Sequence, residues 1–358
     1  MVCGIERLSL LFSTMYVAGC VSTRANGRDN DCPGLQIESR PCTLARVIGL
    51  FLLLAFQPDT AMLRRLYEEK AARVEQQYGP ADPRTAGAYR DLGLYLRQAS
   101  DAAGAREFLK KVLSIDEAQP GASASATIAD IANLARASPP DEAQPLWTRV
   151  SAGADPALAS EALAALGDLR DAAGDKPGAA ELFLKALERE EANSGPYSSK
   201  VAVRLNSLAL VSGPHKAVPL LQRALAIDRK VWGEKHPETA TTEVNLSGEL
   251  LGSGQFAEAV RIGTTALANF EATLGENHPR TAAAASTLAD ALRAVKQNAR
   301  AENLYRRAWA IDERAYGPTH AETLDDVRNL SEFLRETGRA AEAADLDKRL
   351  CASAASCK

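Results

Sequence analysis

Cysteine is confined to the two ends of this 358-residue sequence, because all six cysteines lie either in residues 1–42 or in residues 351–358. Neither group has the CxxC or histidine spacing of a structural zinc site. Positive charge is not in excess either: the formal net charge is −4, whereas binding to a phosphate backbone needs clustered lysine and arginine. These shortages predict no metal centre and no nucleic-acid partner.

Aromatic residues make up only 5% of the chain, and the usual signatures of catalysis are missing. We find no nucleophile–base set, no glycine-rich phosphate loop and no helix-borne metal motif. The sequence therefore predicts that the protein is not an enzyme and that it holds no cofactor.

What the sequence does contain is a short phrase that returns every 42 residues in its second half. The phrase is marked by Gly233, His236, Pro237 and Thr239, then by Gly275, His278, Pro279 and Thr281, then by Gly317, His320, Ala321 and Thr323. The interval is 275 − 233 = 42 and again 317 − 275 = 42. A fixed period of about 20–50 residues is the signature of a solenoid. In a solenoid each unit packs only on its neighbours, so binding uses an extended surface rather than an enclosed pocket.

A second marker, a small residue at which two helices would pack closely, extends the repeat upstream. It falls at Ala105, Ala143, Ala179, Ala217, Ala259, Ala301 and Ala343. Around these alanines, apolar residues recur at spacings of three and four, which is typical of amphipathic helices. In the fifth unit the pattern predicts one helix over about 237–251 and another over about 256–274. A further helix over 61–78 is predicted to cap the start of the array as a half unit.

Three of the four histidines lie in the recurring phrase, which raises the question of a metal site. Equivalent atoms in successive repeats are at least roughly 8–10 Å apart, whereas ligands on one zinc each lie about 2.0–2.1 Å from it. Asp82 stands at the histidine position in a partial upstream copy of the phrase, and aspartate is a good helix N-cap. We therefore expect His236, His278 and His320 to cap the helices that follow them.

At these residues the chain resembles the tetratricopeptide repeat, in particular the 42-residue form found in kinesin light chains. The family pattern of leucine, small residue and then alanine is matched by Leu92-Gly93 with Ala105, Leu166-Gly167 with Ala179, Leu208-Ala209 with Ala217, Leu246-Ser247 with Ala259, Leu288-Ala289 with Ala301, and Leu330-Ser331 with Ala343. The resemblance covers roughly residues 60–350. It implies an all-α fold, a right-handed α-α superhelix of about seven helix pairs. Gly263 and Asp347 stand where a bulky residue is usual, so we expect looser packing in those two units.

The resemblance also implies where a partner binds, because first helices of the family line the inner face and receive a peptide. The asparagine that precedes the marker leucine in kinesin light chains is matched by Asn245 and Asn329, and Asn206 lies one place off. Arginines are expected on the same face at Arg90, Arg293, Arg328 and Arg335. An asparagine amide offers a donor and an acceptor to a peptide backbone, and arginine grips carboxylates. The alternative is that these are ordinary solvated residues on amphipathic helices.

The first sixty residues have a different composition and contain two short apolar segments. Residues 17–20 resemble the lipobox of bacterial lipoproteins, in which Cys20 would be lipidated. Residues 47–56 follow Arg46 and fit the apolar core of a secretory signal peptide, which takes about 7–15 residues. The two readings compete, unless the true start lies further in and residues 1 to about 43 are not translated. Either reading predicts a bacterial protein that is exported and that is periplasmic or associated with the outer membrane. A disordered head with one membrane-adherent stretch is the alternative to export, and a cytoplasmic location is the alternative to the periplasm or outer membrane. At the other end, Cys351 and Cys357 either form a small disulfide or remain unpaired thiols.

Three segments are thus expected: a poorly ordered head over 1–57, a solenoid over 58–350 and a tail over 351–358. The predicted function is a non-catalytic scaffold that binds a partner protein or peptide on its inner face. The alternative is a lipid-anchored envelope assembly protein, peripherally attached to a membrane through its N-terminus. A regulatory subunit of an enzyme is the third hypothesis.

Overall fold

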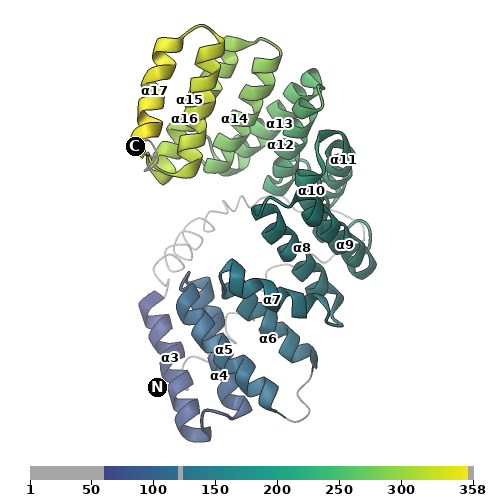
Figure 1. Ribbon diagram of the computed structural model, residues 1–358, viewed down its shortest axis with the longest axis vertical. Coiled ribbons are helices and arrows are strands. Elements are labelled where there is room, and N and C mark those ends of the chain that lie inside the picture. Colours follow the sequence, from purple (N-terminus) through teal and green to yellow (C-terminus); the bar gives the residue numbers. More distant parts are fainter. Residues whose placement is uncertain (1–59, 120–123, 354–358) are drawn as a thin grey trace, which may run out of the picture. The chain divides into compact units, whose positions relative to one another are not determined.

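The computed structural model describes residues 60–119 and 124–353, and every regular element in them is an α-helix (Figure 1). In chain order the helices are α3 (Thr60–Tyr78), α4 (Pro83–Gln98), α5 (Ala102–Ala118), α6 (Ala124–Ala137), α7 (Pro140–Ser151), α8 (Pro156–Ala172), α9 (Lys176–Ser194), α10 (Ser199–Ser212), α11 (Pro214–Val231), α12 (Pro237–Gly252), α13 (Phe256–Leu274), α14 (Pro279–Ala294), α15 (Asn298–Tyr316), α16 (Ala321–Glu336) and α17 (Ala340–Ser353). After α3 they form seven pairs, from α4–α5 to α16–α17. The predicted all-α solenoid of about seven pairs is confirmed.

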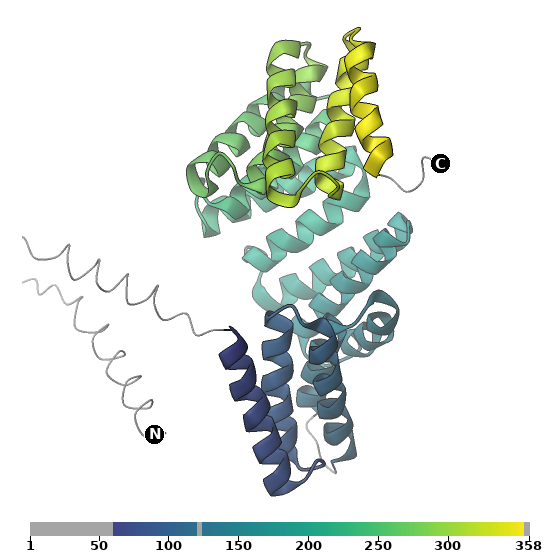
Figure 2. The same ribbon diagram turned by 90° about the vertical axis from the view of Figure 1, so that its left-hand side faces the viewer.

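Each helix packs against the one before it and the one after it in the chain, as Figures 1 and 2 show from two sides. Contacts that skip one helix join the first helices of neighbouring pairs: α4 with α6, α6 with α8, α8 with α10, α10 with α12, and α12 with α14. The first helices therefore lie closer to one another than the second helices do, and they line the inner surface of the stack. The hydrophobic core is local in the same way as the helix contacts, because it consists of four clusters that succeed one another along the chain.

The recurring phrase forms the same closed turn each time it occurs. Gly275 has a φ of +91°, which glycine adopts without steric cost, and it ends α13. Nδ1 of His278 then accepts a hydrogen bond from the backbone N–H of Arg280 at 3.1 Å. His236 and His320 do the same, and Asp82 caps α4 with its carboxylate. The prediction that these residues cap the following helix is confirmed.

Threonine has a role in this turn that the sequence alone did not indicate. The hydroxyl of Thr281 donates a hydrogen bond to the carbonyl oxygen of Gly275 at 2.8 Å, so the turn is closed by a side chain. The same bond recurs in the other three copies of the phrase, at 2.7 to 2.9 Å. Each threonine is at most 1% exposed. The turn is therefore held at two points, by the cap and by the threonine.

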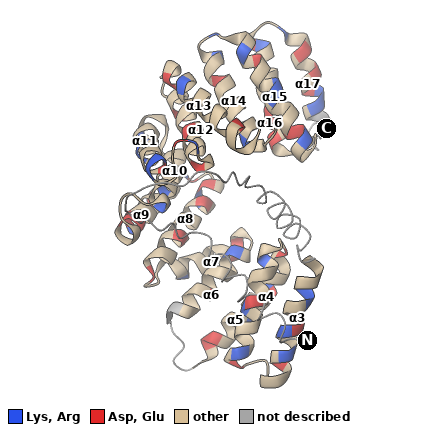
Figure 3. Cartoon of the chain, turned by 180° about the vertical axis from the view of Figure 1, so that it is seen from behind, with Lys and Arg blue, Asp and Glu red and all other residues tan. Residues whose placement is uncertain are grey.

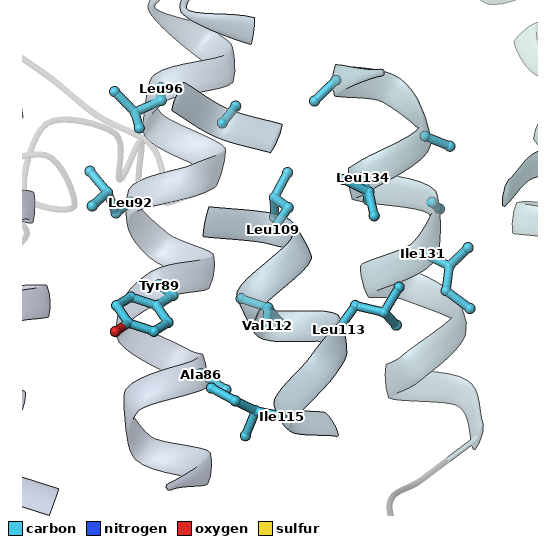
Figure 4. Packing of buried hydrophobic residues seen from close by; sticks show 14 of the residues in the cluster. Ala86, Tyr89, Leu92, Leu96, Leu109, Val112, Leu113, Ile115, Ile131 and Leu134 are labelled. Atoms are coloured by element: carbon cyan, nitrogen blue, oxygen red, sulfur yellow. The ribbon is translucent and has the colours of Figure 1, made fainter. Parts of the chain in front are cut away.

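Small residues let the two helices of a pair approach closely. The marker alanines are all buried, and in α8 a methyl group added to Gly167 would lie 2.7 Å from the ring of Phe183 on α9. In the first pairs, Leu92 of α4, Leu109 of α5 and Ile131 of α6 belong to one buried cluster (Figure 4). The alternation of small and large residues fills each interface at close range.

The expectation of looser packing at Gly263 and Asp347 is wrong. A methyl group on Gly263 would lie 2.8 Å from Oγ of Ser247 and 3.3 Å from Leu288, so the helices have closed on the small residue. Asp347 accepts a hydrogen bond from the hydroxyl of Ser331 at 2.7 Å, and it pairs with Arg335. In both pairs the residue on the facing helix compensates for the unusual one.

No helix among the described residues is long and apolar enough to cross a membrane. Residues 1–57, with Cys20, lie outside the described residues, as does Cys357. Lipidation, export and the terminal disulfide therefore stay predictions.

Candidate functional site

Two of the predicted asparagines are brought together on neighbouring first helices. Nδ2 of Asn245, on α12, donates to Oδ1 of Asn206, on α10, at 3.0 Å. Nδ2 of Asn206 in turn donates to Oγ1 of Thr242 at 2.9 Å and to the carbonyl oxygen of Ala202 at 3.0 Å. Both asparagines are part-buried. Within the described part of the chain Oδ1 of Asn245 accepts no hydrogen bond, so it is an acceptor available to a partner.

The network continues inward to a buried carboxylate. The hydroxyl of Thr242 donates to Oδ2 of Asp228, on α11, at 2.7 Å. Asp228 is only 4% exposed, and burial raises the pKa of its carboxyl, although the hydrogen bond from Thr242 opposes the shift. Because each hydrogen bond fixes the next group, this chain orients the amide of Asn206 and, through it, that of Asn245.

A surface hollow of about 340 Å³ lies over this network, and we call it the central hollow. Its apolar lining is Val203 and Leu210 of α10 with Trp232 at the end of α11, which are 53%, 56% and 45% exposed. Lys200 and Glu238 add one charge of each sign. Three exposed large apolar side chains around one hollow are unusual for a solvated face and typical of a binding surface.

Arg204 of α10 is a largely buried arginine with carboxylates around it. Burial is the largest influence on Arg204 of α10 and lowers the pKa of its guanidinium, while Glu190, Glu161 and Asp168 act in the opposite direction. Its Nε donates to the hydroxyl of Ser160, on α8, at 3.2 Å. Charges of both signs are interspersed along the helices elsewhere, as Figure 3 shows.

Arg90 is placed in an internal ion pair. Its Nε donates to Asp130 of α6 at 2.6 Å, and its Nη2 donates to Asp116 of α5 at 2.9 Å. The side chain of Asp130 is 2% exposed, and the three residues join three successive helices. Burial nevertheless raises the pKa of Asp116 to about 6. These contacts give Arg90 a structural role, and its predicted contact with a peptide is untested.

The remaining predicted residues gather on α14 and α16. Arg293 and Asn329 line a second hollow of about 470 Å³, together with Asp290, Glu332 and Glu336. Nε of Arg293 lies 3.6 Å from Oε2 of Glu336. The lining holds three carboxylates against two cations, Arg293 and Lys296, so this hollow is not a positive groove.

Arg328 and Arg335 lie outside both hollows. Arg328 pairs with Asp325 on its own helix, and Arg335 pairs with Asp347 on α17. Nδ2 of Asn329 makes a long contact of 3.4 Å with the hydroxyl of Ser286 on α14. The structure therefore unites Asn206 with Asn245 and Arg293 with Asn329, whereas Arg90, Arg328 and Arg335 lie apart.

Sequence reasoning missed the apolar part of the central hollow. Trp232 directly precedes Gly233 and therefore reads as the end of a helix, while Val203 and Leu210 read as ordinary members of an amphipathic pattern. The sequence did contain a pattern that could have predicted them. Val203 and Leu210 lie on the same face of the helix as Ser207, the residue before the marker leucine, and that face was expected to bind the partner. No group of three or more histidine, cysteine or acidic side chains in the described residues could hold a metal ion.

Comparison with known proteins adds the family. A family model described as the tetratricopeptide repeat matches residues 206–272, 250–314 and 280–356. A search of curated proteins found no match.

Two solved Rap structures share the fold. The apo form of RapI is 12% identical and aligns over 75% of this chain and 97% of its own, with a TM-score of 0.59. A Rap protein complexed with competence and sporulation factor is 16% identical and aligns over 76% of this chain and 77% of its own, with a TM-score of 0.57. TPR-like repeats of a Podosopora anserina kinesin light chain are 22% identical over 56% of this chain and 97% of theirs, with a TM-score of 0.47. The family model shows that residues 206–356 consist of tetratricopeptide repeats, and the described helices before them form pairs of the same kind.

Proposed function

We propose that this chain is a non-catalytic interaction scaffold that binds a partner peptide in the central hollow, on the face lined by first helices. Tetratricopeptide repeats generally serve as protein-interaction scaffolds, so the family supports the general role. The observation that carries the specific site is the hydrogen-bonded pair Asn206–Asn245 beneath the exposed side chains of Val203, Leu210 and Trp232.

The arrangement suits an extended peptide that carries a large apolar side chain. Oδ1 of Asn245 accepts a backbone N–H of the peptide, and the amide is already oriented by Asn206, so little conformational entropy is lost on binding. The apolar side chain covers Val203, Leu210 and Trp232 and removes their surface from water. Lys200 and Glu238 lie at the margin, where charge affects the choice of partner and the association rate more than the affinity.

A solved structure of the same fold provides a precedent. The Rap protein of the comparison is described as complexed with a competence and sporulation factor. This precedent supports binding by the fold; the peptide that this chain takes is set by its own residues.

The test is selection from a random peptide library on the full-length protein, followed by affinity measurement by fluorescence anisotropy. Asn206→Ala with Asn245→Ala should weaken a selected peptide by up to about tenfold, since the hydrogen bond between the peptide and Asn245 contributes roughly 0.5–1.5 kcal/mol. Trp232→Ala should weaken it further by removing apolar contact. Asn298→Ala is the matched control, because Asn298 is exposed at the start of α15, and it should leave binding unchanged.

Two outcomes count against the proposal, and they are distinct. Selected peptides whose affinity is unaffected by all of the hollow variants would place binding elsewhere on the array. Failure to select any peptide would contradict peptide binding itself.

A further inference from the structure

The junction between α15 and α16 buries two carboxyl groups without a cation. Asp312 of α15 is 5% exposed and Asp326 of α16 is 6% exposed. Within residues 60–119 and 124–353, Oδ1 of Asp312 and Oδ2 of Asp326 have no hydrogen-bond partner. Two ionised carboxylates that share a buried site repel each other and lack the solvation of water, so the site favours a state in which one of them is protonated.

The same pair of positions recurs at an earlier junction, where it is neutralised. Asp116 and Asp130 are separated by 130 − 116 = 14 residues, as Asp312 and Asp326 are by 326 − 312 = 14. Between α5 and α6, Arg90 bonds to both carboxylates at 2.6 to 2.9 Å. Arg90 lies two residues before a marker leucine, and the residue at that position in the later unit is the uncharged Ser286.

Two other junctions show what else these positions can hold. Between α11 and α12 they are Asp228 and Thr242, whose hydroxyl donates to the carboxylate. Between α13 and α14 they are Phe270 and Ala284, both buried and apolar. Of these four junctions, the one between α15 and α16 is the one with two acids and no cation.

The groups around Asp312 and Asp326 raise the pKa of both carboxyls. Burial first, and then the charge of Asp312, raise the pKa of Asp326 to about 7, while Ser286 of α14 opposes the shift. Burial and Glu322, on the first turn of α16, also raise the pKa of Asp312, while His320 at the start of that helix acts in the opposite direction. On α17, Asp347 is bonded to Ser331 and Arg335.

We propose that the junction between α15 and α16 is a proton-dependent latch. A proton shared by Asp312 and Asp326 holds α16 and α17 against the preceding helices, and loss of that proton loosens them. Because Asn329 of the second hollow lies on α16, the latch sets how rigidly that end of the inner surface is held. The latch does not depend on the proposed peptide site.

The sign follows from proton linkage. A carboxyl whose folded pKa is raised binds more protons in the folded than in the open state, so its stabilisation is present at low pH and is lost as pH rises through about 7. With an unperturbed value of 3.8, the open fraction of α16 should increase roughly 100-fold between pH 5 and pH 8.

Hydrogen exchange on the full-length protein, corrected for the intrinsic effect of pH, tests the latch. Protection of amides in α16 and α17 should fall between pH 5 and pH 8, whereas protection in α13, which packs at the apolar junction with α14, should not. Asp326→Asn, a neutral isostere, should abolish the fall and keep high protection at pH 8. His320→Asn, which retains a capping side chain, should preserve the fall and so exclude the histidine as its source.

Each outcome decides the matter. Equal protection of α16 at both pH values in the native chain overturns the latch, as does an undiminished fall in Asp326→Asn. If circular dichroism shows that Asp326→Asn does not fold, Asp312→Asn is measured instead and must abolish the fall for the latch to stand.

Discussion

Replacing Gly167 by alanine should destabilise the pair α8–α9, although alanine is the better helix former. The added methyl carbon would lie 2.7, 2.9 and 3.0 Å from three ring carbons of Phe183, which is 2% exposed. Overpacking of this kind costs about 1–3 kcal/mol, against a gain of about 0.5–1 kcal/mol from removing a helical glycine. We expect a net loss of roughly 0–2.5 kcal/mol, with a central value of about 1 kcal/mol.

Gly248 of α12 supplies the matched control. It too is helical, but a methyl group there would meet nothing within 4 Å, so Gly248→Ala should stabilise by about 0.5–1 kcal/mol. Because long repeat arrays do not unfold in a single step, urea denaturation should be combined with hydrogen exchange of α8 and α9. If both substitutions stabilise to the same degree, the argument from close helix approach is refuted.

Further predictions concern the turns. Lys296 has a φ of +62° where the neighbouring repeats have glycine, so Lys296→Gly should raise the free energy of unfolding by about 0.5–1 kcal/mol in urea denaturation, and Lys296→Ala should not. Thr281→Val removes the buried hydrogen bond to the carbonyl oxygen of Gly275 and should lower the free energy of unfolding by about 1–2 kcal/mol. Thr287→Val is the control, because the hydroxyl of Thr287 is bonded only within α14, and it should leave the free energy of unfolding nearly unchanged. Equal effects of the two substitutions would contradict the role of the closed turn. His278→Ala should lower stability by about 1 kcal/mol and His278→Asn should restore it, as thermal denaturation would show.

The limits of the helices could be predicted because their signals are local. The cap at His236 and the left-handed Gly275 bound α12 and α13 within a residue or so of the predicted ends. These signals act through the backbone of a few neighbouring residues, so they need no knowledge of the stack. The prediction at Gly263 failed for the opposite reason, since its packing depends on Ser247 of the facing helix.

The candidate site was predictable only in part. The family pattern identified Asn206 and Asn245, whose amides meet because first helices of successive units lie side by side. Arg90 looked like a groove residue because nothing in its own helix reveals that Asp130, forty residues later, lies within 2.6 Å. The position of Trp232 in the central hollow could not be predicted for a similar reason. Its apolar neighbours there belong to α10, and only the packing of the helices against one another brings them together.

The turn that is held by both the helix cap and the threonine has the same backbone in each copy, whereas the side chains that pack between repeats differ from one repeat to the next. Excision of residues 233–274, one full period, would lead from Trp232 directly into the identical turn at Gly275 and should leave the main-chain path intact. The new boundary would place Asp228 opposite Ala284 instead of Thr242 and deprive its carboxylate of a donor. The shortened chain should therefore fold, but the interface between the newly adjacent repeats should be less stable. Ala284→Thr should restore its stability by supplying the missing donor to Asp228.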